Sequence, residues 1–216
     1  MENRRQVKSR NNNIFHKLSR GLVSIGLKPN HISVMSFVFA LLGGYGFYLI
    51  SINQIILGSI LSLIGIQLRL ICNLIDGLMA VEGKLSSPQG ELYNDIPDRF
   101  SDWALIVSCG FVLQSHPYGW HLVWGATVLA IMTAYIRVLG ASQGVGHDFG
   151  GPMAKQHRMA ILNLALIGSI VESILYDKIT GISIAVGIII IALGSALTSI
   201  LRCFRIAKAL GEKNQA

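Results

Sequence analysis

The chain has 216 residues, of which 52% are hydrophobic and only 13% are charged, and its mean hydropathy is +0.55. Soluble domains carry about 25% charged residues, so this composition excludes an ordinary soluble protein and indicates a single integral membrane domain. The three cysteines, Cys72, Cys109 and Cys203, are far apart in the sequence, which argues against a disulfide framework or a thiolate metal site.

Basic residues are concentrated at the N-terminus, ahead of the first apolar run. The chain has a net charge of +7, and seven of its 18 basic residues lie before residue 29: Arg4, Arg5, Lys8, Arg10, Lys17, Arg20 and Lys28. A nucleic-acid-binding arm is one interpretation of such a run. However, a hydrophobic segment follows at once, and basic flanks are typical of cytoplasmic loops beside membrane spans. We therefore expect no nucleic-acid partner.

Residues 14–28 place apolar side chains at helical spacing and carry Lys17 and Arg20 among them. A helix with this pattern lies in the membrane surface and is attracted to anionic lipids. We predict that residues 1–31 form a basic, amphipathic juxtamembrane segment on the cytoplasmic side and that residues 32–216 form the membrane domain.

Six apolar runs follow, at about 32–50, 54–75, 100–114, 119–138, 159–176 and 180–201. A spanning helix needs about 20 apolar residues, and the third run is short. Counting it as a span places Lys84, Lys155 and Arg158 in loops on the same side as the two basic termini. Pro97 is tolerated in the first turn of a helix, so the third span is expected to begin near residue 95.

The predicted fold class is therefore all-α, a polytopic membrane protein with six transmembrane helices and an N-terminal interfacial amphipathic helix. The positive-inside rule predicts that both termini are cytoplasmic, in a bacterial-type inner (cytoplasmic) membrane. The same rule places the loop after the second span on the cytoplasmic side.

Six of the 11 acidic residues lie between Asp76 and Asp102, around that loop. Acidic side chains near a bilayer are costly and mark functional sites by default. Residues three, four and seven positions apart share a helix face. Two sets have such spacing: Asn73, Asp76, Gly77 and Ala80, and then Gly90, Asn94, Asp98 and Asp102. Carboxylates beside small residues at a membrane surface suit Mg²⁺ or Mn²⁺ holding a diphosphate.

This stretch resembles the signature of the CDP-alcohol phosphotransferase family, D-x2-D-G-x2-A-R-x8-G-x3-D-x3-D. The eight motif positions fall on Asn73, Asp76, Gly77, Ala80, Val81, Gly90, Asn94 and Asp98, with every spacing kept. The segments 27–33 and 135–158 also resemble the family, so the resemblance covers most of the chain.

The resemblance implies a transferase of phospholipid biosynthesis, which moves a phosphatidyl group from CDP-diacylglycerol to a small polar alcohol and releases CMP. Serine, glycerol and inositol are candidate acceptors, as are phosphorylated alcohols such as inositol phosphate or glycerol phosphate. The resemblance also implies a homodimer. The motif positions also imply roles for single residues. The donor nucleotide is expected to bind near Asn73, Gly77, Ala80 and Gly90. Asp76 is expected to ligate the metal ion, and Asp98 to ligate it and to act as the general base.

Three motif positions depart from the signature, because Asn73 and Asn94 replace aspartates and Val81 replaces an arginine. An amide oxygen can ligate a metal ion but brings no charge. We therefore expect metal affinity to fall, or one of two metal sites to be lost. Asp95 and Asp102 can supply compensating charge, and we include both, with Asn73 and Asn94, among the candidate metal ligands.

Several basic residues have two interpretations. Arg69 lies within the second span, where it could bind the donor or form a tie between helices to a carboxylate. The resemblance makes Arg137, Lys155 and Arg158 candidates for binding an acceptor phosphate, while the positive-inside rule alone also predicts basic residues there.

Two other classes of function remain open from the sequence. The amides at positions 73 and 94 allow a catalytically silent protein that binds a CDP-lipid or acts as an assembly subunit. A small metal or solute carrier is a third possibility, but carriers bind their substrates near the bilayer midplane, and these carboxylates are predicted at the inner surface.

Overall fold

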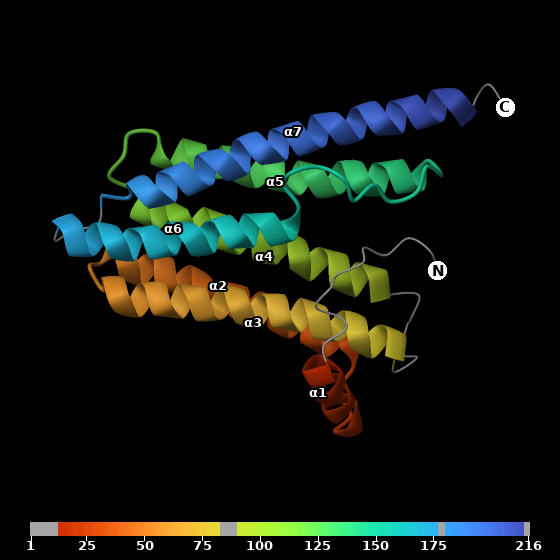
Figure 1. Ribbon diagram of the computed structural model, residues 1–216, viewed down its shortest axis with the longest axis horizontal. Coiled ribbons are helices and arrows are strands. Elements are labelled where there is room, and N and C mark those ends of the chain that lie inside the picture. The colour runs from red at the N-terminus through yellow and green to blue at the C-terminus, as the bar shows by residue number, and fades with distance from the viewer. Residues whose placement is uncertain (1–12, 83–89, 177–179, 214–216) are drawn as a thin grey trace. The chain divides into compact units, whose positions relative to one another are not determined.

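The computed structural model describes residues 13–82, 90–176 and 180–213. The basic residues at positions 4–10, Lys84 and Lys178 lie outside the described residues. The described ranges form seven helices, α1 (Asn13–Ser24), α2 (Pro29–Ser51), α3 (Ile55–Glu82), α4 (Gly90–Val112), α5 (Gly119–Ser142), α6 (Lys155–Tyr176) and α7 (Ile182–Lys213) (Figure 1). They contain no strand, so the all-α prediction is confirmed.

Five of these helices, α2, α3, α5, α6 and α7, are long and apolar enough to cross a membrane. The chain is an integral membrane protein. The third predicted span, residues 100–114, corresponds to the second half of α4 and is not confirmed. The helix has 23 residues, but its first half carries Asp95, Asp98 and Arg99.

Helix α4 begins earlier than predicted. It starts at Gly90, so Pro97 lies inside the helix rather than in its first turn, and the predicted start near residue 95 is wrong. A proline there removes one backbone donor but does not end the helix, because the residues on both sides keep helical geometry.

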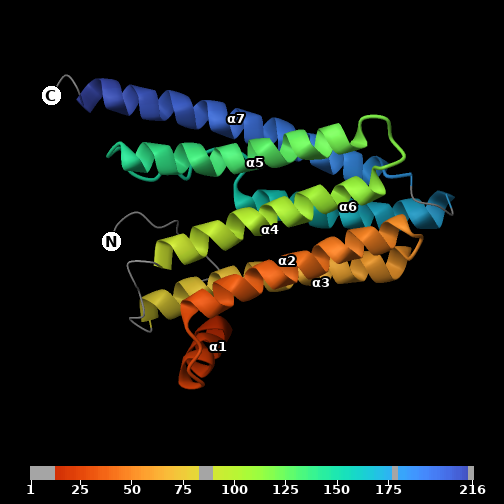
Figure 2. The same ribbon diagram turned by 180° about the vertical axis from the view of Figure 1, so that it is seen from behind.

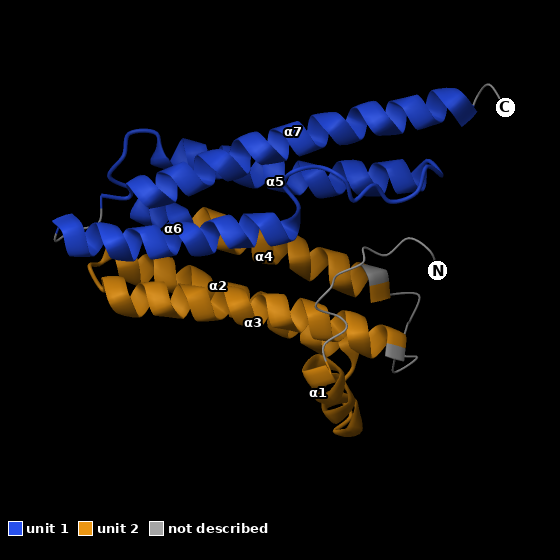
Figure 3. Cartoon of the chain, viewed as in Figure 1, with its two compact units in different colours: residues 1–5, 109–216 blue, residues 6–108 orange. Residues whose placement is uncertain are grey.

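The chain divides into two compact units, unit 2 over residues 6–108 and unit 1 over residues 1–5 and 109–216 (Figure 3). The division falls inside α4. The boundary predicted at residue 31 falls in the first turn of α2, and both α1 and α2 belong to unit 2.

Within unit 2, α2 and α3 run antiparallel and side by side (Figures 1 and 2). Glycines make this close approach possible, because small residues let two helix backbones pack closely. A Cβ on Gly46 would lie 2.5 Å from the Gly58 carbonyl oxygen, and one on Gly65 would lie 2.5 Å from the Gly43 nitrogen. Ser62 Oγ also donates to the Gly43 carbonyl at 2.9 Å. These contacts fix the register in which α2 faces α3.

The amphipathic helix predicted over residues 14–28 is α1, which lies across the end of the α2–α3 pair (Figure 2). Its Leu22 and Val23 pack against a buried cluster of Ile32, Cys72, Ile75 and Met79. One face of α1 is thereby covered by protein, at the end of unit 2 where α2 begins and α3 ends.

The first part of α4 also packs within unit 2. The Phe37 and Phe100 ring centroids are 5.8 Å apart, and a Cβ on Gly44 would lie 2.5 Å from Ser108 Oγ. Helix α2 therefore contacts both α3 and the part of α4 that belongs to unit 2.

In unit 1, α7 packs against both α5 and α6, and α5 and α7 lie side by side in both views (Figures 1 and 2). Residues 143–154 connect α5 to α6. Gly151 in this connection has φ +116°, and a Cβ there would lie 2.5 Å from Thr198 Cγ2. The connection is thus held closely against α7.

Candidate active site

Asp76 is held by the start of α2. Its carboxylate is buried, with 4% of the residue exposed, and Ser33 Oγ donates to Asp76 Oδ2 at 2.7 Å. Ser33 in turn lies 3.2 Å from the Pro29 carbonyl oxygen of its own helix. The first turn of α2 therefore fixes the orientation of the first retained aspartate of the motif.

Asn73 uses its amide nitrogen as a donor. Asn73 Nδ2 lies 3.0 Å from Ser36 Oγ and 3.1 Å from the Arg69 carbonyl oxygen. A carboxylate cannot donate a hydrogen bond when ionised, so an aspartate at this position could not make the bond to the carbonyl. The amide is therefore part of the contact between α2 and α3.

Arg69 connects α3 to α4. Its Nη2 atom lies 2.6 Å from Asp102 Oδ1 and 3.8 Å from Asp98 Oδ1, and 3.5 Å from the Asp98 carbonyl oxygen. The exposed fractions are 0% for Arg69 and 1% for Asp102, so this is a buried ion pair. The structure shows the interhelical tie, one of the two interpretations of Arg69. Donor binding by Arg69 stays a prediction.

The remaining residues of α4 differ in exposure. Asp98 is buried, Asn94 one turn earlier is exposed, and Asp95 is half-buried. Asp95 Oδ1 lies 3.6 Å from Arg99 Nη2, four residues later on the same helix. The structure thus brings Asp98 and Asp102 together at Arg69 and pairs Asp95 with Arg99.

The small residues of the motif flank this network. Gly77 and Ala80 are half-buried within a turn or so of Asp76 on α3, and Gly90 is half-buried at the start of α4. Val81, in the position of the motif arginine, is 58% exposed. Their predicted contacts with the donor nucleotide stay predictions.

The donor atoms of this region suit a hard divalent cation, since they are carboxylate and amide oxygens. Within the described ranges, no three His, Cys, Asp or Glu side chains gather in a metal-binding arrangement. Asp102 is held by Arg69, whereas Asp76 and Asp98 occupy the two retained aspartate positions. Ligation of Mg²⁺ or Mn²⁺ stays a prediction for all six candidate ligands, Asp76, Asp98, Asn73, Asn94, Asp95 and Asp102.

A second polar cluster lies in unit 1. Arg137 and Arg158 are buried, with exposed fractions of 9% and 1%. Arg137 Nη1 lies 3.2 Å from His147 Nδ1, and its guanidinium lies 5.3 Å from the centre of the Phe149 ring. Arg158 Nη1 donates to the Met153 carbonyl at 3.2 Å. The third predicted residue, Lys155, is half-buried at the start of α6.

Two arginines of this cluster, Arg202 and Arg205 of α7, were not among the candidates predicted from the sequence. Arg202 is 5% exposed and donates through Nε to the Gly150 carbonyl at 2.9 Å and through Nη1 to the Thr133 carbonyl. Arg205 Nε lies 3.1 Å from Asp148 Oδ2. Their spacing of three in an apolar helix was the available signal, because one turn then carries two cations on one side.

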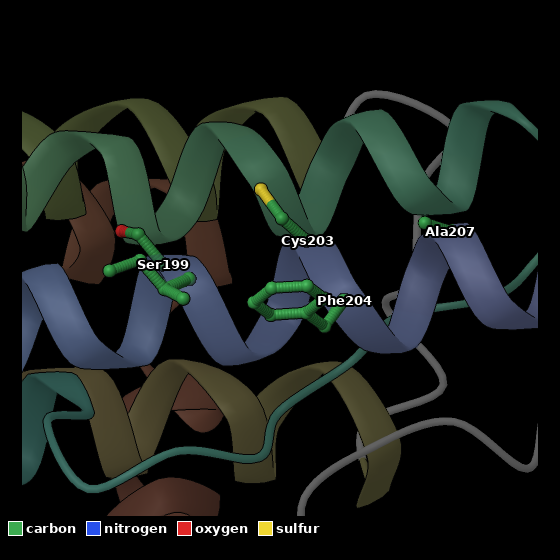
Figure 4. Close-up of a pocket in the computed structure, with 5 residues that line it drawn as sticks. Ser199, Cys203, Phe204 and Ala207 are labelled. Carbon is green, nitrogen blue, oxygen red and sulfur yellow. The ribbon is translucent and has the colours of Figure 1, made fainter.

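A separate pocket on α7 has different chemistry. Its lining consists of Ser199, Ile200, Cys203, Phe204 and Ala207 (Figure 4). None of these five side chains is acidic or basic, so the pocket does not suit a phosphate or a metal ion. The acidic network of unit 2 and the arginine cluster of unit 1 are therefore the candidate sites.

The sequence has relatives that match over nearly its full length, although no protein-family model matches it. An archaetidylinositol phosphate synthase of Pyrococcus horikoshii is 27% identical over 199 residues, which cover 91% of this chain and 92% of the relative. An uncharacterized protein of Aquifex aeolicus is 28% identical over 189 residues, which cover 87% and 86%.

Solved structures share the fold. Mycobacterium tuberculosis phosphatidylinositol phosphate synthase with CDP-DAG bound has a TM-score of 0.71 at 20% identity and covers 90% of this chain and 94% of its own. The same enzyme in complex with manganese and citrate has a TM-score of 0.69 at 20% identity, with 89% and 88% covered. The chain is thus similar to a curated synthase over nearly its full length and shares the fold of a second synthase. Two of the four aspartate positions of the motif are occupied by Asn73 and Asn94.

Proposed function

We propose that this chain is a divergent member of the CDP-alcohol phosphotransferase family. Its proposed activity is that of a phosphatidyltransferase, which transfers the phosphatidyl group of CDP-diacylglycerol to a small polar alcohol and releases CMP. The observation that carries the proposal is the placement of Asp76 and Asp98. Both occupy retained motif positions, both are buried, and Ser33 and Arg69 hold them where α3 ends and α4 begins. The solved relative with CDP-DAG bound, which has the same fold, supports this choice of donor.

In the proposed reaction, the acceptor hydroxyl attacks the phosphorus that carries the lipid. A new P–O bond forms to the acceptor, and the bond from that phosphorus to the bridging oxygen breaks, so CMP leaves with the electron pair. Asp98 accepts the proton of the hydroxyl. A bound Mg²⁺ or Mn²⁺ would neutralise charge on the diphosphate, while Gly77, Ala80 and Gly90 leave space for the nucleotide.

The proposed acceptor is a phosphorylated alcohol, such as inositol phosphate or glycerol phosphate. Arg137, Arg158 and Lys155 are the proposed ligands of its phosphate, because guanidinium groups bind phosphate oxygens through paired donors. Two of these side chains are buried and cationic, which solvated loop residues are not expected to be. The names of both the archaeal and the mycobacterial relatives also specify a phosphate-bearing product.

CMP release is the direct test. Purified protein is incubated with labelled CDP-diacylglycerol, Mg²⁺ or Mn²⁺, and a panel of free and phosphorylated alcohols. We expect CMP release with at least one acceptor and its loss in Asp98→Asn and in Asp76→Asn. Glu212→Gln is the matched control, because this carboxylate lies 3.9 Å from Lys208 on the exposed surface of α7. Folded protein that releases no CMP across the panel would contradict the proposal.

The second candidate is a catalytically silent protein that binds the CDP-lipid. Asn73 favours this candidate, because an amide replaces a carboxylate of the motif and donates a hydrogen bond to Ser36 Oγ. This candidate predicts that CMP or CDP-diacylglycerol binds the folded chain and that no acceptor gives turnover.

The membrane arrangement is also proposed. We propose six spans, including the second half of α4, with both termini and the acidic network on the cytoplasmic side of a bacterial-type inner membrane, and a homodimer as the assembled form. Labelling of single cysteines placed at residues 52 and 118 with a membrane-impermeant reagent tests this topology. Both positions should react from outside the cell, whereas the C-terminus should be protected.

A further inference from the structure

The connection between α5 and α6 is fastened to one face of α7. Three residues of α7 at helical spacing contact it, Thr198, Arg202 and Arg205. The Met153 backbone nitrogen donates to Thr198 Oγ1 at 2.9 Å, and Arg202 Nε donates to the Gly150 carbonyl at 2.9 Å. Most connections run exposed over a protein surface, whereas Met153 is 5% exposed and Thr198 is fully buried. This connection is therefore an ordered part of unit 1.

Close approach sets the position of the connection at Thr198. Gly151 has φ +116°, and a Cβ there would lie 2.5 Å from Thr198 Cγ2. A positive φ is readily adopted only by glycine. On α7, a Cβ on Gly194 would collide with the Met153 side chain. Glycines on both partners thus allow the hydrogen bond between Met153 and Thr198 to form.

The same connection contacts two of the proposed phosphate ligands. His147 Nδ1 lies 3.2 Å from Arg137 Nη1, and the Met153 carbonyl accepts a hydrogen bond from Arg158 Nη1 at 3.2 Å. Met153 therefore binds Thr198 through its nitrogen and Arg158 through its carbonyl. Two hydrogen bonds in series join a buried hydroxyl of α7 to a buried guanidinium of α6.

We propose that Thr198 is a positioning residue for phosphate binding, which acts through Met153 on Arg158. A guanidinium binds phosphate oxygens through paired donors of fixed direction, so the placement of Arg158 matters as well as its charge. Thr198 carries no charge and acts on the anion only through this relay. The inference rests on the proposed function in taking Arg158 as a ligand of the acceptor phosphate.

Thr198→Val removes the hydroxyl while it keeps the shape and the charge of the side chain, and Thr198→Ser keeps the hydroxyl. The matched control is Thr127→Val, because Thr127 is 1% exposed and its Oγ1 donates to the Val123 carbonyl of its own helix at 2.8 Å. Hydrogen exchange in detergent micelles checks the first bond of the relay. The peptide that contains Met153 should exchange faster in Thr198→Val alone.

Binding of inorganic phosphate tests the inference without turnover. Line broadening in ³¹P NMR is followed with the full-length protein in a phosphate-free detergent, without divalent cations, and the site is defined as the broadening that Arg158→Met removes. We expect Thr198→Val to weaken this binding about three- to tenfold, and Thr198→Ser and Thr127→Val to stay close to the original affinity. Equal affinities in Thr198→Val and Thr198→Ser would overturn the inference, as would the lack of any broadening that depends on Arg158.

Gly151→Ala approaches the same contact from the connection and also covers a folding failure of Thr198→Val. Its control is Gly144→Ala, since Gly144 too has a positive φ, but a Cβ there would meet only the end of the Lys213 side chain, at 3.0 Å. We expect Gly151→Ala to weaken phosphate binding and Gly144→Ala to leave it unchanged. If both variants bind phosphate equally well, the inference is wrong.

CMP release separates this inference from the proposed function. Thr198→Val should raise KM for a phosphorylated acceptor and leave KM for CDP-diacylglycerol unchanged, whereas a general loss of structure would lower kcat for both. Turnover of a phosphorylated acceptor with the same KM in Thr198→Val and Thr198→Ser would overturn the inference alone. Phosphate binding that follows the expected pattern, in a protein that releases no CMP with any acceptor, would overturn the proposed function alone.

Discussion

Ser33→Ala tests whether α2 contributes to the site through a single hydrogen bond. Ser33 is 4% exposed, and its hydroxyl donates to Asp76 Oδ2 at 2.7 Å. Hydrogen bonds to charged groups contribute about 1.5–3 kcal/mol. Because about 1.4 kcal/mol corresponds to a factor of ten, a carboxylate that loses this donor should bind its ligands in the site roughly ten- to a hundredfold more weakly.

The assay is CMP release as a function of Mn²⁺ concentration, together with thermal unfolding in detergent. We expect Ser33→Ala to raise the half-saturating Mn²⁺ concentration by about that factor, and Ser33→Thr, which keeps the hydroxyl, to restore it. Ser51→Ala is the control, because Ser51 donates at 2.7 Å to the Tyr48 carbonyl of its own helix. If Ser33→Ala and Ser51→Ala give the same metal dependence, the hydrogen bond does not position Asp76.

Three further predictions concern packing, acceptor binding and a helix end. Gly46→Ala should lower the free energy of unfolding by about 1–3 kcal/mol, since its Cβ would lie 2.3 Å from Ser62 Oγ, whereas Gly125→Ala, with nothing within 4 Å, should be neutral in the same unfolding measurement. Arg158→Met should raise KM for a phosphorylated acceptor about tenfold or more and leave KM for CDP-diacylglycerol unchanged; equal rises in both would contradict a role in acceptor binding. Glu172→Gln should lower stability by about 1 kcal/mol, because Glu172 accepts bonds from the Thr180 hydroxyl and the Ser183 backbone nitrogen at the start of α7; an unchanged thermal midpoint would refute this capping role.

Most helices were predicted correctly from the periodicity and length of the apolar segments, because both depend on residues that are close together in the sequence. Close packing between α2 and α3 depends on four glycines at positions 43, 46, 58 and 65, and the helix pair is formed by the first two predicted spans. The start of α4 was predicted at the wrong residue, because the preference of proline for the first turn of a helix takes no account of contacts with other helices. In the structure, the contact of Phe37 with Phe100 packs the turn after Pro97 against α2, and the helix extends back to Gly90.

The candidate site was predictable only in part. Motif spacing identified Asp76 and Asp98, since spacing along one helix determines a shared face. The partners of these residues lie on other helices, and helix spacing cannot show which helices meet. The sequence therefore did not identify Ser33 as the partner of Asp76 or Asp102 as the partner of Arg69, and Arg202 was overlooked.

The pairing of Arg69 with Asp102 has a consequence for the order of events during synthesis of the protein. The arginine emerges from the ribosome 33 residues before its partner, and an arginine at the centre of a spanning helix costs roughly 2.5–3.5 kcal/mol on insertion scales. The glycine-mediated contact of α2 with α3 can form earlier and offset part of that cost. We therefore expect α2 and α3 to enter the bilayer together as a hairpin and α3 to gain its full stability there only once α4 has arrived.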